Sequence, residues 1–129
     1  APGLRLREFV YLQILNPRQK HPIFSSDLPL WRFSVNPSAG PLPIEKEIKN
    51  QLLIDWGGAQ RWLTGNYSQH ELVTIARSAK GHISLFRGGD RSGEVFQSPA
   101  DPLKALQINL KKAIDPGFIL NPGRLYSWL

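Results

Sequence analysis

Two arginines stand where a planar cation could bind a carboxylate. Arg32 lies in the middle of an alternating apolar segment, and Arg87 ends another such segment directly before Gly88 and Gly89. A guanidinium binds carboxylates and phosphates through paired hydrogen bonds, and loops that follow strands often carry sites. The sequence therefore makes both arginines candidates for binding an anion. A structural role for Arg32, along a neighbouring side chain or against Asp55, is the alternative.

Three further polar residues could contribute to a site. His82 begins an apolar segment, and Asn121 and Arg124 belong to an Asn-Pro-Gly-Arg segment near the end of the chain. The structural alternatives are a packed histidine, a turn that fixes the chain end, and an inter-domain ion pair for Arg124. The chain has no cysteine, and its three histidines lack metal-ligand spacing. We therefore predict no metal site.

The composition is that of a globular domain with a basic surface. The chain has 129 residues, 41% of them hydrophobic, and a formal net charge of +6. This length suffices for one compact core but not for two full domains. No apolar run approaches the roughly 18 residues that a membrane span needs. The basic charge is consistent with acidic partners, and a solvated surface with some net charge is the alternative. The lack of cysteine agrees with a reducing cytosolic setting.

The middle of the chain predicts three strands. Residues 30–35 alternate bulky and polar side chains, which is typical of a strand. Residues 51–64 predict a hairpin, because Gly57-Gly58 can take the positive φ angles of a tight primed turn. This turn sets Trp56 opposite Ala59, Ile54 opposite Arg61, and Leu53 opposite Trp62. Residues 1–20 fit neither a strand nor a helix clearly.

Two helices and a fourth strand follow. Ser68–Lys80 predicts a helix with a Ser68/Glu71 capping box and a left-handed stop at Gly81, and residues 82–86 predict a strand. A last helix begins at Asp101 as its cap and ends at residues 115–117. Its apolar face consists of Leu103, Leu106, Leu110, Ala113 and Ile114. The order predicts an α+β fold in which helices cover one face of an antiparallel sheet.

The tail, residues 110–126, resembles the ending of the FAD-linked oxidases of the vanillyl-alcohol oxidase superfamily. Its Asp-Pro-Gly-Phe at residues 115–118 departs slightly from the usual Asp-Pro-x-Gly of that family. Residues 30–35, 52–62 and 86–90 narrow the resemblance to the E subunits of bacterial glycolate oxidases. The likeness extends from about residue 21 to residue 126.

The resemblance implies a ferredoxin-like cap domain over residues 21–129, preceded by a leader or linker at residues 1–20. In such proteins FAD is bound mainly by an N-terminal domain, which this chain lacks, so the isolated domain would be inactive and hold no cofactor. Arg87, Asn121 and Arg124 would contact the flavin, and Arg32 and His82 would contact glycolate or a similar 2-hydroxyacid. The implied partners are a catalytic FAD subunit and an iron–sulfur subunit. The implied location is cytoplasmic, with peripheral association of the complex at the inner face of the membrane as an option.

One departure bears on catalysis. Related catalytic subunits have Glu-His-Gly-Ile-Gly where this chain has Phe-Arg-Gly-Gly-Asp at residues 86–90. An arginine stays protonated and cannot accept a proton from a hydroxyl. We therefore expect a subunit that holds FAD and exchanges electrons beside the catalytic subunit, rather than one that oxidises substrate itself. Oxidation of substrate with another residue as the base is the alternative.

A small basic binding module is the competing hypothesis. Trp31, Phe33 and Trp62, with Arg32 and Arg61, could stack single-stranded nucleic acid, and the basic charge would also suit an acidic protein. These side chains alternate between the two faces of the predicted sheet, so we do not expect nucleic acid as a partner. Trp128, which follows the tail motif, is expected to be frayed or to pack on the missing domain.

Overall fold

The computed structural model describes residues 21–46 and 51–129. The chain divides into two units, with the boundary between Asp90 and Arg91. The second unit holds one helix, α4 (Asp101–Ile114), and the tail that follows it. The described elements of the first unit are, in order, α2 (Pro22–Ser25), β1 (Leu30–Ser34), η1 (Pro43–Lys46), β2 (Leu52–Asp55), η2 (Trp56–Gly58), β3 (Gln60–Thr64), α3 (Gln69–Ser78) and β4 (His82–Arg87).

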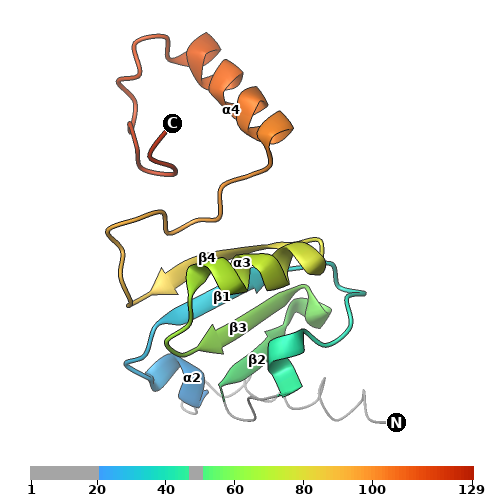
Figure 1. The fold of residues 1–129 in the computed structure, drawn as a ribbon. Helices are drawn as coiled ribbons and strands as arrows, with labels where there is room; N and C mark the ends of the chain where they lie inside the picture. Colours follow the sequence, from blue (N-terminus) through green and yellow to red (C-terminus); the bar gives the residue numbers. More distant parts are fainter. Residues whose placement is uncertain (1–20, 47–50) are drawn as a thin grey trace. The chain divides into compact units, whose positions relative to one another are not determined.

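The four strands form one antiparallel sheet in the order β2-β3-β1-β4 (Figure 1). This is the strand order of a ferredoxin-like split βαβ fold, in which α3 provides the crossover from β3 to β4. In the described part of the β1–β2 connection the short 3₁₀ helix η1 stands where such folds have a longer helix. The predicted α+β class is confirmed.

The hairpin has the predicted register. Leu53 pairs with Trp62 and Ile54 with Arg61. Gly57 and Gly58 take φ angles of 64° and 98°, as a primed turn requires. Trp56 was predicted as a strand residue opposite Ala59. It instead belongs to the turn, where its carbonyl accepts the Ala59 N–H at 3.2 Å.

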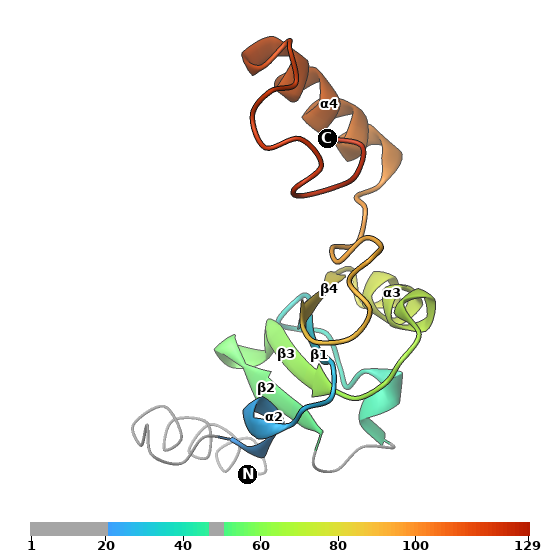
Figure 2. The ribbon, with the colours of Figure 1, turned by 90° about the vertical axis from the view of Figure 1, so that its left-hand side faces the viewer.

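The two faces of the sheet are covered by different elements. Residues that pair across neighbouring strands point to the same face of the sheet. Arg61 donates to Glu45 of η1, so η1 lies on the face to which Arg61 points. Ile44 of η1 and Leu72 of α3 line one groove, so η1 and α3 both lie on the Arg61 face (Figure 2). The helix α2, which was not predicted, packs on the opposite face, where the rings of Phe24 and Trp62 are 5.5 Å apart. The core fills mainly the α3 side, where Leu72 is fully buried.

A buried ion pair fastens the long β1–β2 connection to the sheet. The Arg61 side chain is 4% exposed and that of Glu45 11%. The guanidinium also donates to the carbonyls of Ala39 at 2.8 Å, Gly40 at 2.9 Å and Gly58 at 3.3 Å. Because buried charges need partners for every donor, Arg61 fixes this loop and the hairpin turn relative to each other.

The ends of α3 differ from the prediction. Ser68 is the N-cap residue, but its side chain makes no capping hydrogen bond, so the predicted capping box was wrong. The chain before the helix is held instead by the Tyr67 hydroxyl, which is 3.2 Å from Gln51 Oε1. At the other end the left-handed residue is Lys80, with φ 53°. Gly81 is needed for another reason, since a Cβ there would overlap the backbone oxygen of Ser34.

The second unit exposes the apolar face of its helix. Ala100 is the N-cap of α4, one residue before the predicted cap. The large apolar side chains of the predicted stripe are between 49% and 69% exposed; they are Leu103, Leu106, Leu110 and Ile114. This helix therefore presents an apolar surface that its own unit does not cover.

The buried ion pair gives a stability prediction. Arg61→Ala should lower the free energy of unfolding by about 3–5 kcal/mol, because it leaves the Glu45 carboxylate and three carbonyls without a donor. Urea denaturation measures this loss. Arg77→Ala, at an exposed arginine of α3, is the control and should stay within about 0.5 kcal/mol of the wild type. A loss below about 1 kcal/mol for Arg61→Ala would contradict the importance given to this pair.

Candidate functional site

The strand register brings two of the predicted site residues onto one face of the sheet. Arg32 pairs with Trp62 on one side and Ser84 on the other, and His82 precedes Ser84 by two residues on the same strand. Arg32 and His82 are therefore diagonal neighbours on adjacent strands, and such neighbours lie about 7–8 Å apart. We call this surface, made of Arg32, Trp62, His82, Ser84 and Phe86, the Arg32 face.

Arg32 is a half-buried cation without an acidic partner among the described residues. Its Cζ atom lies 5.9 Å from the centroid of the Phe86 ring, close enough for a cation–π contact. The suggested pairing with Asp55 is not formed, because the Asp55 carboxylate accepts the Trp56 N–H at 2.7 Å. A guanidinium that is partly desolvated and not neutralised attracts an anionic ligand.

Aromatic rings surround this cation. The Trp62 ring meets those of Phe24 at 5.5 Å and Phe86 at 5.0 Å, both edge to face. Trp62 is 9% exposed, whereas Phe86 is 52% exposed. The Arg32 face thus combines one cation with an accessible aromatic surface, which suits a flat or anionic group.

A row of polar side chains crosses the same face at one end of the sheet. Ser34 pairs with Gln60 and with His82, and Gln60 pairs with Asp55, so the four share a face. Sequence reasoning missed Ser34 and Gln60 as candidates. The hairpin register could place Gln60 relative to Asp55. Only the long-range pairing of β1 with β3 and β4 brings in Ser34 and His82.

Arg87 lies at the end of β4 and connects it to α2. Its two terminal nitrogens donate to the carbonyls of Phe24 and Ser26, each at 2.8 Å. Its backbone pairs with Leu30 beyond a register shift in β1. Arg87 therefore has a structural role, and its contact with a cofactor stays a prediction.

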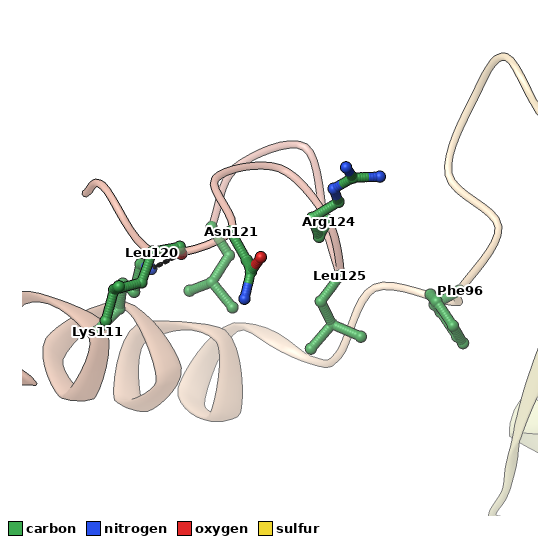
Figure 3. Close-up of a pocket in the computed structure, with 7 residues that line it drawn as sticks. Phe96, Lys111, Leu120, Asn121, Arg124 and Leu125 are labelled. Atoms are coloured by element: carbon green, nitrogen blue, oxygen red, sulfur yellow. Dashed lines mark hydrogen bonds between the residues drawn. The ribbon is translucent and has the colours of Figure 1, made fainter. Parts of the chain in front are cut away.

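Asn121 and Arg124 belong to the second unit. Both line a hollow between α4 and the tail, together with Lys111, Leu120 and Leu125 (Figure 3). Figure 3 shows the Asn121 side chain directed into the hollow and the Arg124 guanidinium directed away from it. Asn121 has a φ of 48°, a left-handed conformation that asparagine tolerates better than most residues. Their contacts with a cofactor stay predictions.

The Asp115 carboxylate organises the tail. It accepts the N–H groups of Ile119 at 3.1 Å and Leu120 at 2.9 Å, and the Lys111 ammonium is 2.7 Å away. Lys111 also donates to the Leu120 carbonyl at 2.5 Å. The hydrogen bond from Lys111, followed by that from Leu120, holds the pKa of Asp115 below its ordinary value. The sequence showed this aspartate only as a helix terminator.

The chain end closes back onto its own unit. Trp128 stacks on Tyr126 with the ring centroids 4.7 Å apart, and the Lys104 ammonium lies 4.8 Å from the Trp128 ring. The backbone N–H and the hydroxyl of Ser127 both donate to Glu94, and these bonds, the hydroxyl first, lower the pKa of Glu94. The expectation that Trp128 is frayed was therefore wrong, because cation–π and stacking contacts hold it within the unit. Its packing on a missing domain stays a prediction.

Aromatic side chains that could stack on nucleic-acid bases are buried. Trp31 and Phe33 are 5% and 0% exposed, and Arg61 is buried in its ion pair. Within residues 21–46 and 51–129, no group of three His, Cys, Asp or Glu side chains could hold a metal ion. Among the same residues no helix is long and apolar enough to cross a membrane.

Comparison with known proteins found one relative. The chain is 39% identical over 111 residues to the glycolate oxidase subunit GlcE of Escherichia coli (strain K12). The alignment covers 86% of this chain and 30% of that protein, so the chain spans less than a third of its relative's length. No protein-family model and no solved structure matches the chain.

The hydrogen bonds of Asp115 predict that the stability of the tail depends on pH. Because the pKa of Asp115 is lower in the folded tail than in an unfolded chain, its stabilising effect is full above about pH 4 and is lost as the pH falls toward the folded pKa. Asp115→Asn should remove this acid transition and loosen the tail at neutral pH. The indole N–H signal of Trp128 in NMR spectra reports the change. An identical acid transition in Asp115→Asn would contradict the assignment to this carboxylate.

Proposed function

We propose that this chain is the flavin-covering part of an FAD-linked glycolate oxidase subunit, and that its Arg32 face lies over the isoalloxazine ring. The observation that carries the proposal is an unpaired, half-buried Arg32 beside the exposed ring of Phe86. The 39% identity to a glycolate oxidase subunit supports it independently.

The residues of the Arg32 face fit a flavin. Phe86, which is 52% exposed, offers apolar ring surface to a flat heterocycle, and a cation near the ring stabilises the negative charge that reduction adds. When bound, a flavin accepts and donates electrons for the conversion of a 2-hydroxyacid to a 2-oxoacid. FAD would be held mainly by the part of the subunit that lies outside this chain.

The apolar stripe of α4 supports a second element of the proposal. Four large side chains of this helix are about half exposed or more, which is unusual for a surface that stays in water. More than two thirds of the relative's length has no counterpart in this chain. We propose that the stripe packs on that remaining part of the subunit, and that Asn121 and Arg124 approach the flavin from the same unit.

We propose electron transfer as the role of the subunit, with a 2-hydroxyacid able to bind at the Arg32 face without being oxidised there. Arg32 can bind the carboxylate of glycolate or a similar 2-hydroxyacid, and His82 lies diagonally beside it. Arg87, at the position of the histidine in related catalytic subunits, cannot accept the hydroxyl proton. The proposed partners are therefore a catalytic FAD subunit and an iron–sulfur subunit. The proposed location is the cytoplasm, with peripheral contact to the inner membrane face.

Flavin content tests the first part of the proposal. The full-length protein, separated from its partner subunits, should carry FAD, whereas residues 21–129 alone should retain none and oxidise no glycolate. The absorbance spectrum and the FAD released on denaturation give the measurement. A full-length protein without flavin would contradict the proposal.

Substitution of Arg32 tests the role of its face. In the full-length protein, Arg32→Gln should weaken the binding of oxalate, an anionic analogue of the substrate, by about 10–100-fold, because a hydrogen bond to a charged group contributes about 1.5–3 kcal/mol. Titration of the flavin spectrum measures the affinity. Arg32→Lys should restore part of it, and Arg77→Gln on exposed α3 is the control. Unchanged affinity in Arg32→Gln would remove Arg32 from the site.

A further inference from the structure

The strand β4 contains a β-bulge beside the Arg32 face. Trp31 of β1 pairs with Leu85 of β4. The preceding residue of β1, Leu30, pairs with Arg87, so β4 has one additional residue at this point, Phe86. Leu30 lies on the Arg32 face by the alternation of β1, and a paired residue points to the same face as its partner. The bulge therefore directs two consecutive side chains, those of Phe86 and Arg87, to one face.

Arg87 uses this orientation to hold the short helix α2. Its two terminal nitrogens donate to the carbonyls of Phe24 and Ser26, each at 2.8 Å. These carbonyls lie at the C-terminal end of α2, where a helix leaves such groups without intrahelical partners. A helix of four residues is not stable by itself, and besides Arg87 it is the burial of Ile23 that fixes it to the sheet. The planar guanidinium thus fastens α2 over one end of the Arg32 face.

A row of contacts leads from α2 to Arg32. The Phe24 ring lies 5.5 Å from that of Trp62, and the Trp62 ring lies 5.0 Å from that of Phe86. Phe86 in turn lies 5.9 Å from the Cζ atom of Arg32. Among the residues that the structure describes, no hydrogen bond or ion pair holds the Arg32 guanidinium. Its direction therefore depends on the Phe86 ring, and through the row on α2.

We infer that Arg87 is a positioning residue, which holds α2 in place and thereby orients Arg32 for an anionic ligand. The inference rests on the proposed function, because that proposal puts the ligand at the Arg32 face. An arginine that fixes another residue in a binding-competent orientation lowers the entropy that the other residue loses when its ligand binds.

Arg87 is not free to bind the ligand itself. Both of its terminal nitrogens are used by carbonyls of α2, which it would have to release. The chain directly after it is also constrained, because Gly88 and Gly89 have φ angles of 68° and 67°. A Cβ at Gly89 would lie 3.3 Å from the Pro29 side chain, so only glycine fits there without adjustment. The bulge before Arg87 and the glycines after it keep its side chain on α2.

A double-mutant cycle with Arg32 tests the inference. The dissociation constant of oxalate is measured in the full-length protein by titration of the flavin spectrum. Arg87→Gln should weaken the binding of oxalate by about 5–10-fold, although Arg87 does not contact it. In an Arg32→Gln background the same change should weaken it less than about twofold, because no guanidinium is left to orient. A merely structural role would give the same loss in both backgrounds.

Further variants separate the contacts of α2 from the charge of Arg87. Phe24→Ala removes no charge but interrupts the same row, so it should also weaken oxalate binding. Its combination with Arg87→Gln should bind about as weakly as the weaker single variant, since both act through α2. Arg77→Gln on exposed α3 is the control and should leave the affinity unchanged. FAD content and melting temperature are recorded for each variant, and Arg87→Lys, a milder change, takes the place of Arg87→Gln if the latter does not retain FAD.

Unchanged oxalate affinity in Arg87→Gln would overturn the inference, and so would an equal loss with and without Arg32. Unchanged affinity in Phe24→Ala would overturn it as well, because α2 would then not be the link. Failure of the proposed function has a different signature, which is unchanged affinity in Arg32→Gln itself. A loss in Arg32→Gln without a loss in Arg87→Gln leaves the proposed function intact and removes only the role of Arg87.

Discussion

Alternation of side chains across paired strands is the constraint from which the other features of this domain follow. Because Arg32 pairs with Trp62 and Ser84, these residues share one face, and Phe33, Arg61 and Ile83 share the other. The second face is covered and buried by α3 and η1. The first face keeps a half-buried cation, an exposed phenylalanine and a polar row. A sheet with one face fully buried and the other only partly covered, by α2, can cover a ligand held by something else.

Two carboxylates, those of Glu45 and Asp115, fix loop segments that the strands and long helices do not hold in place. Glu45 pairs with Arg61, which also donates to the Gly58 carbonyl and so ties the β1–β2 connection to the hairpin turn. Asp115 accepts three hydrogen bonds and fixes the tail of the second unit, where Asn121 lines a hollow. In both places an ionic group satisfies backbone groups that would otherwise lie unpaired. The candidate site residues are thereby placed by polar contacts as much as by the apolar core.

The sequence predicted those features that depend on neighbouring residues. The hairpin register followed from Gly57-Gly58, and the elements around α3 and α4 followed from local patterns of apolar residues. Long-range pairing was not readable, so the meeting of Ser34, Gln60 and His82 on one face was missed. The same holds for the partners of Arg61 and for the contacts of Arg87 with α2. The absence of the Ser68 capping bond shows that a correct local pattern does not fix a side chain when tertiary contacts position the helix.

If the Arg32 face covers a flavin, a crystal structure of the full-length subunit with bound FAD will show the isoalloxazine ring in van der Waals contact, about 4 Å, with side chains of that face. An isoalloxazine ring bound elsewhere, with Arg32 and Phe86 exposed to solvent or packed against an unrelated element, would rule out this role of the face.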